Sequence, residues 1–364
     1  MKDCCDNSIG LCKRFNEYYE LDLQDLEVVT ELASGPYFYL PFSALLAGAK
    51  VNLVGKDSPY GKFTDLRKSF EDTARKLKID HFEIHHCSIP ERVWSQADIV
   101  TNSYMLRPIT PSQISLMKQS SVIPLMWETW EFRHTDFCIK SCIENSVTVV
   151  GTNENGPKLN MFPLNGMLAM KLLFELKCEI YENELVLLGS SKSGEYTARA
   201  LEALGISFDW YTQTGDEREN RCYPYSELRN ILGKQYLDAI ICNESCFYQE
   251  LVGQESALSF FELKQAFPYL KWAHIYGNID VPQLQESGIR HSPKKIRPAK
   301  FMSYQPSELG DKPVIKLNAV GLKVGELVTR ARRSGLSIED SIQVAVDYGL
   351  GQDFEGGYMN YQIR

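Results

Sequence analysis

Short apolar runs, each ending in polar residues or glycine, alternate with longer polar stretches through the first half of the chain. Runs of this length and composition predict buried β-strands. Four strands are predicted, at 50–54, 97–102, 122–126 and 147–151. Helices are predicted around 43–48 and over 62–78. Because strands separated by helices cannot be joined by hairpins, the pattern predicts a parallel sheet.

The same alternation returns in the second half of the chain. Strands are predicted at 185–189, 208–211, 238–242 and 272–276, with a helix at 196–204. This spacing is typical of a doubly wound sheet. Just before it, residues 161–176 are apolar nearly all round, which predicts a fully buried helix, and a position between two domains would bury it.

The tail of the chain has a different pattern. After Pro293, a helix pattern over 317–333 stops at Gly335. Ser337 then gives a capping-box-like start to a last helix that ends near Tyr348. We expect this tail to return and pack on the first domain.

The predicted fold class is therefore α/β, with two Rossmann-like domains that hold parallel sheets and are separated by a cleft and a buried interdomain helix. One domain is predicted at 1–158 together with about 300–364. The other is predicted at 159–299.

Composition limits the classes of protein to be considered. The chain of 364 residues is too long for a single domain with one ordinary hydrophobic core. Its 44% apolar residues are enough to form the cores of two domains. The formal charge is −8 without a basic stripe, so no nucleic-acid partner is expected. Acids at the N-terminus and the absence of a long apolar run predict a cytoplasmic protein without a membrane partner.

The ten cysteines of such a chain are expected to be reduced thiols. Cys138 and Cys142, like Cys242 and Cys246, are four positions apart, whereas structural zinc sites use tighter pairs. No metal site is expected.

The sharpest motif lies between a predicted strand and a helix and reads Gly189-Ser190-Ser191-Lys192-Ser193-Gly194. In dinucleotide-binding loops the first glycine makes the turn, the second lets backbone approach the pyrophosphate, and the third lets helix pack on strand. Gly189 and Gly194 hold the first and third places, and Ser191 holds the second. The Ser191 hydroxyl could donate a hydrogen bond to a phosphate, and the Lys192 ammonium could add a positive charge beside it. The alternative is a plain Gly/Ser turn.

The following strand does not end in the acid that would bind the ribose 2′-hydroxyl of NAD. Thr212 stands at this position instead. Three alternatives therefore remain open, namely NADP, another adenosine ligand, or no cofactor.

Three stretches carry a family resemblance. Gly151-Thr152-Asn153-Glu154, with the apolar helix after it, is similar to a hinge and interdomain helix, and 185–204 is similar to a cofactor-binding strand, loop and helix. Ala273-His274-Ile275-Tyr276-Gly277-Asn278-Ile279-Asp280 is similar to a strand end near a nicotinamide ring. Together they resemble the superfamily of S-adenosylhomocysteine hydrolase and the D-2-hydroxyacid, formate and glycerate dehydrogenases.

The resemblance implies NAD or NADP as cofactor, bound by the second domain, with the nicotinamide against the strand ends at Asn243 and Gly277. It also implies that Asn153 and Glu154 face the cleft. Asn278 stands where the hydrolase motif has its histidine. The family's lysine and aspartate before the interdomain helix, and the arginine, glutamate and histidine set of the dehydrogenases, are not in register here.

Candidate substrate chemistry lies in the first domain. Residues 124–134 place two tryptophans, two acids, an arginine and a histidine at the end of one apolar strand. Since the carboxyl ends of parallel strands face the ligand crevice, Arg133 is predicted to clamp a substrate carboxylate and Glu128 to act as a base. Asn102 and Arg107 follow another predicted strand and could line the same cleft. The alternative is a solvated loop whose tryptophans pad an interface.

His274 lies inside the last apolar strand of the second domain and is either an acid/base catalyst or a core residue. The leading hypothesis is an NAD(P)-using biosynthetic enzyme, a homodimer, that acts on a small carboxylate-bearing metabolite. A second hypothesis keeps the fold but makes the protein a non-redox enzyme with an adenosine or S-adenosyl ligand. A third is a catalytically degenerate binding subunit.

Overall fold

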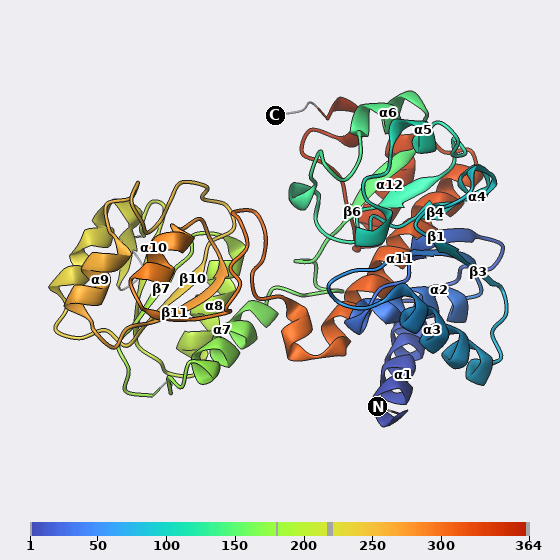
Figure 1. Cartoon of the computed structure of the whole chain (residues 1–364). Helices are drawn as coiled ribbons and strands as arrows, with labels where there is room; N and C mark the ends of the chain where they lie inside the picture. The colour runs from blue at the N-terminus through green and yellow to red at the C-terminus, as the bar shows by residue number, and fades with distance from the viewer. Residues whose placement is uncertain (1, 180, 217–220, 362–364) are drawn as a thin grey trace. The chain divides into compact units, whose positions relative to one another are not determined.

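The chain forms two compact units (Figure 1), and the computed structural model describes residues 2–179, 181–216 and 221–361. Unit 1 comprises Met1–Asn160 and Gly310–Arg364, and unit 2 comprises Met161–Leu309. The chain leaves unit 1 once and returns to it, so unit 2 is an insertion within the sequence of unit 1.

Within the described residues, unit 1 holds a seven-stranded sheet in the order β13-β6-β5-β4-β1-β2-β3. The strands are β1 (Glu27–Glu31), β2 (Lys50–Gly55), β3 (Phe82–His86), β4 (Ile99–Val100), β5 (Val122–Pro124), β6 (Thr148–Thr152) and β13 (Gly351–Gln352). Neighbouring strands are parallel, except that the short β13 pairs antiparallel with β6. The order reverses between β1 and β4, which is the arrangement of a doubly wound sheet.

Helices cover this sheet, and α11 and α12 come from the C-terminal part of the chain (Figure 1). The α-helices are α1 (Lys2–Tyr18), α2 (Leu40–Leu46), α3 (Phe63–Leu77), α4 (Glu91–Gln96), α5 (Pro111–Ile114), α6 (Ile139–Glu144), α11 (Asp311–Arg333) and α12 (Ile338–Asp347). The 3-10 turns are η1 (Gly35–Tyr39), η2 (Tyr104–Leu106), η3 (Thr129–Glu131) and η6 (Tyr358–Asn360). Helix α11 packs on α1, α2, β4, β5 and β6, so the tail completes the core of unit 1.

The core of unit 1 joins residues that are far apart in the sequence. Phe42 of α2 stacks on Phe70 of α3 with ring centroids 4.4 Å apart, and Leu322 of α11 belongs to the same cluster. Helix α11 approaches the loop that follows β5 closely at Gly321. A Cβ at Gly321 would lie 2.7 Å from the Met126 side chain.

The strands predicted at 50–54, 122–126 and 147–151 appear as β2, β5 and β6, with ends that differ by a residue or two. The strand predicted at 97–102 is shorter and is confined to β4. Strands β1, β3 and β13 were not predicted. β1 lies in the middle of the sheet although only Val28 and Val29 of its five residues are apolar, so its burial comes from its neighbours rather than from its own composition.

In its described residues, unit 2 holds a six-stranded parallel sheet in the order β12-β11-β10-β7-β8-β9. The strands are β7 (Leu185–Leu188), β8 (Phe208–Thr212), β9 (Cys222–Pro224), β10 (Ala239–Asn243), β11 (Lys271–Tyr276) and β12 (Arg290–Ser292). The helices are α7 (Leu164–Glu175), α8 (Lys192–Ala203), η4 (Tyr225–Gly233), α9 (Phe260–Ala266), α10 (Val281–Glu286) and η5 (Pro306–Leu309). This is the strand order of dinucleotide-binding folds, reversing between β7 and β10.

Alternating residues of β7 pack into two apolar layers, one on each face of the sheet. Leu188 points to a layer that contains Phe260 and Trp272, whose rings lie 4.9 Å apart. Leu187 points to the other layer, which is formed largely by α7 and α8. Both faces of the sheet are therefore covered, as a parallel sheet requires.

Helix α7 corresponds to the apolar segment at 161–176 and packs on α8 and β11. Its inner face is buried, but Met167 and Phe174 on the opposite face are 56% and 58% exposed. The composition of this segment predicts a helix that is buried on every face. In the structure, one face of the helix is exposed.

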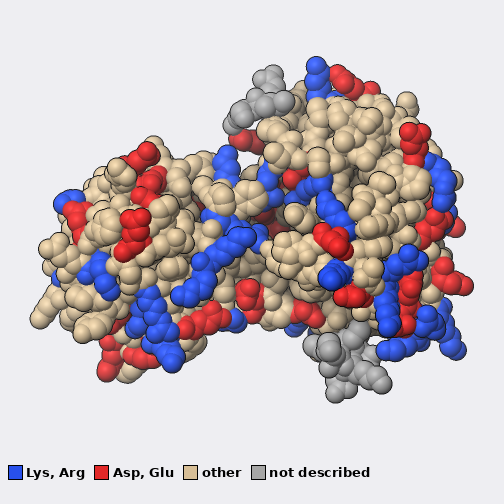
Figure 2. Space-filling view, viewed as in Figure 1, with Lys and Arg blue, Asp and Glu red and all other residues tan. Residues whose placement is uncertain are grey.

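None of the described helices is long and apolar enough to cross a membrane. The cysteines whose side chains are described are not joined in disulfides. Charged side chains of both signs are interspersed over the visible face of each unit (Figure 2).

The α7–α8 contact yields a test of packing. Gly166 of α7 lies against α8, and a Cβ at this position would come within 2.2 Å of the Ala200 Cβ. Gly166→Ala should therefore lower the free energy of unfolding by about 1–3 kcal/mol, although alanine is the better helix former. Thermal unfolding followed by circular dichroism measures this loss.

The double variant Gly166→Ala/Ala200→Gly provides the matched control. It exchanges the two residues, keeps one methyl group at the contact and leaves the summed helix propensity unchanged, so it should recover most of the lost stability. A single variant that melts at or above the wild-type temperature would show that the close approach is not constraining.

Candidate functional site

The carboxyl ends of β1, β4, β5 and β6 lie at one edge of the unit 1 sheet, and the strand order reverses there. Ligands of doubly wound sheets bind outside this edge. Three loops that begin at the edge carry the polar residues predicted from the first domain: 101–107, 125–136 and 153–155.

Arg107 is a half-buried cation of this edge with three contacts. Its Nη2 donates to the backbone oxygen of Asn102 at 2.7 Å, and its Nη1 lies 3.6 Å from Oδ1 of Asp136. Its guanidinium carbon lies 4.4 Å from the centre of the Trp127 ring. Asn102 is fully buried and donates from Nδ2 to Asp136 Oδ2 at 3.2 Å. These contacts fix a planar guanidinium, the group best suited to orient a carboxylate.

Three polar atoms of this group have no hydrogen-bond partner among the described residues, namely Arg107 Nε, Trp127 Nε1 and Asn102 Oδ1. Buried polar atoms without partners are rare, since each costs the free energy of its lost hydration. Two of the three are donors and one is an acceptor.

Glu31 ends β1 at the same edge and was not a candidate from the sequence, because its strand was not predicted. Its side chain is buried, and its Oε2 accepts a hydrogen bond from the Met105 backbone N–H at 3.0 Å. Burial raises the pKa of the Glu31 carboxyl, and the charge of Arg107 opposes part of that rise.

Glu128, the predicted base, is buried where β5 leads into η3. Its Oε2 accepts a hydrogen bond from Trp130 Nε1 at 2.6 Å. Burial raises the pKa of this carboxyl, while the bonds from Trp130 and from the backbone N–H groups of Asn155 and Glu154 act in the opposite direction. A carboxyl with a raised pKa is suited to proton transfer near neutral pH.

Two further carboxyls interact electrostatically with Glu128. Burial raises the pKa of Glu131 to about 7, with Arg133 lowering it and Glu128 raising it further. Burial and repulsion from Glu131 and Glu128 raise the pKa of Glu154 well above its ordinary value. Acids that raise one another's pKa hold their protons to a higher pH than isolated glutamates do.

The structure thus brings five predicted residues of the first domain to one edge: Asn102, Arg107, Glu128, Arg133 and Glu154. Arg133 is half-buried, and its charge acts on both Arg107 and Glu131. Asn153 lies beside them after β6, where its backbone N–H donates to the Leu350 oxygen at 2.8 Å.

In unit 2, the glycine loop joins β7 to α8 with little space between its glycines. A Cβ at Gly194 would lie 2.3 Å from the Gly189 oxygen, and a Cβ at Gly189 would lie 2.6 Å from the Asn243 oxygen. The two glycines therefore let the helix begin against the strand end, as the first and third glycines of the dinucleotide-binding motif do.

The middle of the loop differs from that motif. Ser191 is the N-cap residue of α8, but its side chain makes no capping bond, and its Oγ instead accepts from the Ser245 backbone N–H at 3.3 Å. The first-turn N–H groups of α8 are left without a side-chain cap, which suits an anion. Lys192 is paired with Glu195 at 3.2 Å.

An acid of the chain also contacts the loop. The Ser190 backbone N–H donates to Oε2 of Glu244 at 2.6 Å. At the end of β8, the Thr212 Oγ1 accepts from the Gly215 backbone N–H at 2.9 Å. The loop therefore has the backbone geometry for a phosphate, but one of its amides is already bonded to a carboxylate.

Asn243, predicted to contact the cofactor, is fully buried. Its Nδ2 donates to Asn165 Oδ1, to the Ser193 oxygen and to Thr197 Oγ1, all at 2.9–3.1 Å. This amide holds α7 and α8 to the end of β10.

His274, predicted to be either an acid/base catalyst or a core residue, also lies in the core of unit 2. It is fully buried, its Nδ1 accepts from Trp272 Nε1 at 3.3 Å, and burial lowers its pKa to about 3. Gly277, with φ 138°, would place a Cβ 2.5 Å from the Cys242 Sγ. Asn278 donates from Nδ2 to the Tyr248 oxygen at 2.9 Å, so both residues shape the turn after β11.

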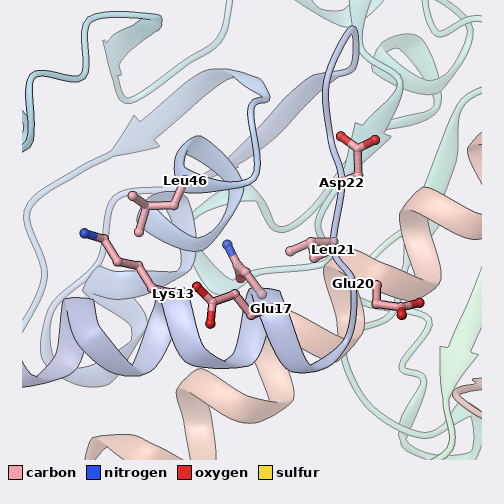
Figure 3. Close-up of a pocket in the computed structure, with 7 residues that line it drawn as sticks. Lys13, Glu17, Glu20, Leu21, Asp22 and Leu46 are labelled. Carbon is pink, nitrogen blue, oxygen red and sulfur yellow. The ribbon is translucent and has the colours of Figure 1, made fainter.

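A pocket of about 520 Å³ in unit 1 lies away from this chemistry. Figure 3 shows Lys13 and Glu17 on α1 facing Leu46, with Leu21 and Asp22 beyond them. These residues precede β1 and β2, so the pocket belongs to the amino ends of the strands. In the part of the chain that the structure describes, no group of three or more His, Cys, Asp or Glu side chains could hold a metal ion.

Two doubly wound units, one with a glycine loop at its point of reversal, define the chain as a two-domain α/β protein of the Rossmann type. No protein-family model matches the sequence, and no curated relative matches it. Its fold is similar to that of a dipicolinate synthase chain from Bacillus halodurans, at 13% identity and a TM-score of 0.53, over 82% of this chain and 96% of that one.

The corresponding dipicolinate synthase chain from Bacillus subtilis is similar over 86% of this chain and 99% of its own, at 12% identity and a TM-score of 0.54. A 2-hydroxyacid dehydrogenase from Ketogulonicigenium vulgare Y25 also aligns, at 10% identity over 86% of this chain and 96% of that one, with a TM-score of only 0.46. The predicted α/β class is confirmed by the likeness of fold to the two dipicolinate synthase chains. Identities this low do not extend the likeness to a reaction.

The raised pKa of Glu131 predicts a pH-dependent stability. A glutamate in an unfolded chain has a pKa of about 4.3. The folded protein therefore binds the Glu131 proton more tightly than the unfolded chain does. Glu131 therefore makes the folded state less stable as pH rises from about 4.5 to 7. Glu131→Gln should stabilise the protein at pH 8 by on the order of 1–3 kcal/mol and change little at pH 5.

Denaturant unfolding of both proteins at the two pH values measures this difference. Glu144→Gln, which removes an exposed acid from α6, is the matched control and should not change the slope of stability with pH. Parallel pH profiles for wild type and Glu131→Gln would refute the coupled acid cluster.

Proposed function

We propose that the protein is an NAD(P)-dependent enzyme of the 2-hydroxyacid dehydrogenase type that acts on a small carboxylate-bearing metabolite. The observation that carries this proposal is the acid cluster of Glu128, Glu131 and Glu154 beside two guanidiniums at one edge of unit 1. Burying so many ionisable groups is costly, and they gather where ligands bind.

The roles follow from the contacts. Arg107, already oriented by Asp136 and Trp127, and Arg133 would hold the substrate carboxylate. Glu128 and Glu131 would exchange the proton that accompanies oxidation of a hydroxyl or reduction of a carbonyl. With a pKa of about 7, Glu131 can give or take that proton at neutral pH.

The nucleotide would be held in unit 2 by the backbone amides of 190–194 and by the positive end of α8. The close contact of Gly189 with Gly194 fits this role. A bound nicotinamide would accept or supply a hydride. Thr212 places no charge at the end of β8 that would repel a 2′-phosphate, which favours NADP over NAD.

A second function is favoured by one observation, the bond between Glu244 and the Ser190 amide. An adenosine or S-adenosyl ligand brings no pyrophosphate and would not compete with this carboxylate. The protein would then be a non-redox enzyme that transfers protons at the same edge of unit 1.

Thermal unfolding of the full chain with NAD, NADP, S-adenosylmethionine and S-adenosylhomocysteine distinguishes the two. A ligand that binds only the folded protein raises the melting temperature. We expect NADP at millimolar concentration to raise it most. A rise with the S-adenosyl ligands alone would favour the second function, and no rise with any of the four would overturn both.

The carboxylate site has its own test, independent of nucleotide. Arg133→Met should weaken binding of small dicarboxylates such as malonate by roughly tenfold to a hundredfold, because a hydrogen bond to a charged group contributes about 1.5–3 kcal/mol. Isothermal titration calorimetry measures the affinity. Arg67→Met, which removes an exposed arginine from α3, should leave it unchanged. Equal affinities for wild type and Arg133→Met would remove Arg133 from the site.

A further inference from the structure

Glu244 is a buried carboxylate that follows β10 and receives hydrogen bonds from three parts of unit 2. It is 1% exposed. Its Oε2 accepts from the Ser190 backbone N–H at 2.6 Å, from the Ser190 hydroxyl, and from the Tyr225 hydroxyl at 2.6 Å. Its Oε1 accepts from the backbone N–H groups of Cys246 at 2.7 Å and Phe247 at 3.2 Å.

These bonds give the carboxylate the environment that a glycine loop provides for a phosphate. Such loops bind anions through backbone N–H groups at the junction of strand and helix. Here the Ser190 amide, the first after Gly189, is bonded to an anion that belongs to the chain. The lysine of the loop, Lys192, is paired with Glu195 instead.

A pyrophosphate at this loop would meet two obstacles. It would find the Ser190 amide and hydroxyl already bonded, and its charge would be repelled by a buried carboxylate at short range. The Tyr225 hydroxyl strengthens the second obstacle because it donates to Glu244 and holds it in place.

We propose that Glu244 is a built-in competitor for the phosphate-binding loop, so that a phosphate-bearing ligand binds fully only when this side chain releases the Ser190 amide. The inference rests on the proposed function, in which the loop holds a nucleotide. It makes Glu244 a determinant of affinity and selectivity, since a ligand without phosphates does not need to displace it.

The test uses the full chain and two probes, NADP and inorganic pyrophosphate, with affinities measured by calorimetry. Glu244→Gln keeps the size of the side chain and removes its charge, and it should bind both probes at least about tenfold more tightly than wild type. Tyr225→Phe removes one bond that holds Glu244 and should give a smaller gain. Glu202→Gln, which removes an exposed acid from the far end of α8, is the control and should give none.

Tyr225→Phe leaves Glu244 and the loop intact, so it still tests the proposal if Glu244→Gln fails to fold. Tighter binding of both probes supports the inference and the nucleotide function together. Tighter binding of pyrophosphate, with no binding of NADP by any variant, keeps the inference and removes the nucleotide function. Wild-type binding of NADP that the variants leave unchanged or weaken overturns the inference and keeps the nucleotide function. No gain for either probe in the folded variants also overturns it.

Discussion

Parallel strands of a sheet all end at the same edge, and this constraint shapes the chemistry of both units. At that edge the backbone leaves the sheet, so polar side chains from distant parts of the sequence come together. In unit 1 the edge gathers Glu31, Arg107, Glu128 and Glu154 from four different strand ends. In unit 2 the same constraint places Glu244 against the loop that follows β7.

The buried acids at the two edges differ in how their charges are stabilised. In unit 2 the carboxylate of Glu244 receives five hydrogen bonds, so it resembles a bound anion. In unit 1 the acids have fewer donors and instead raise one another's pKa values. A charge with all its hydrogen bonds made stabilises one conformation, whereas acids that raise one another's pKa respond to pH and to ligands.

The sequence predicts the fold class because apolar runs of strand length mark most strands, and Gly189 and Gly194 mark the turn into α8. It does not predict β1, whose polar residues are buried by the strands on either side. Glu31 was missed with its strand. The edge residues of the loops after β4 and β5 were found because they directly follow apolar runs. The burial of His274 and Asn243 depends on neighbours distant in sequence, and no local pattern distinguishes them from ligand-facing residues.

The return of the chain to unit 1 as α11 has a consequence for the order of folding during synthesis. Domains fold as units once their residues have left the ribosome, and those made first usually fold first. Unit 2 ends at Leu309, but the core of unit 1 lacks Leu322 and the rest of α11 until later residues are made. The first part of unit 1 therefore waits, with its sheet uncovered on the α11 side, while the inserted unit can already be complete. Chaperones that bind exposed apolar surface could therefore bind residues 27–152 before α11 has been made.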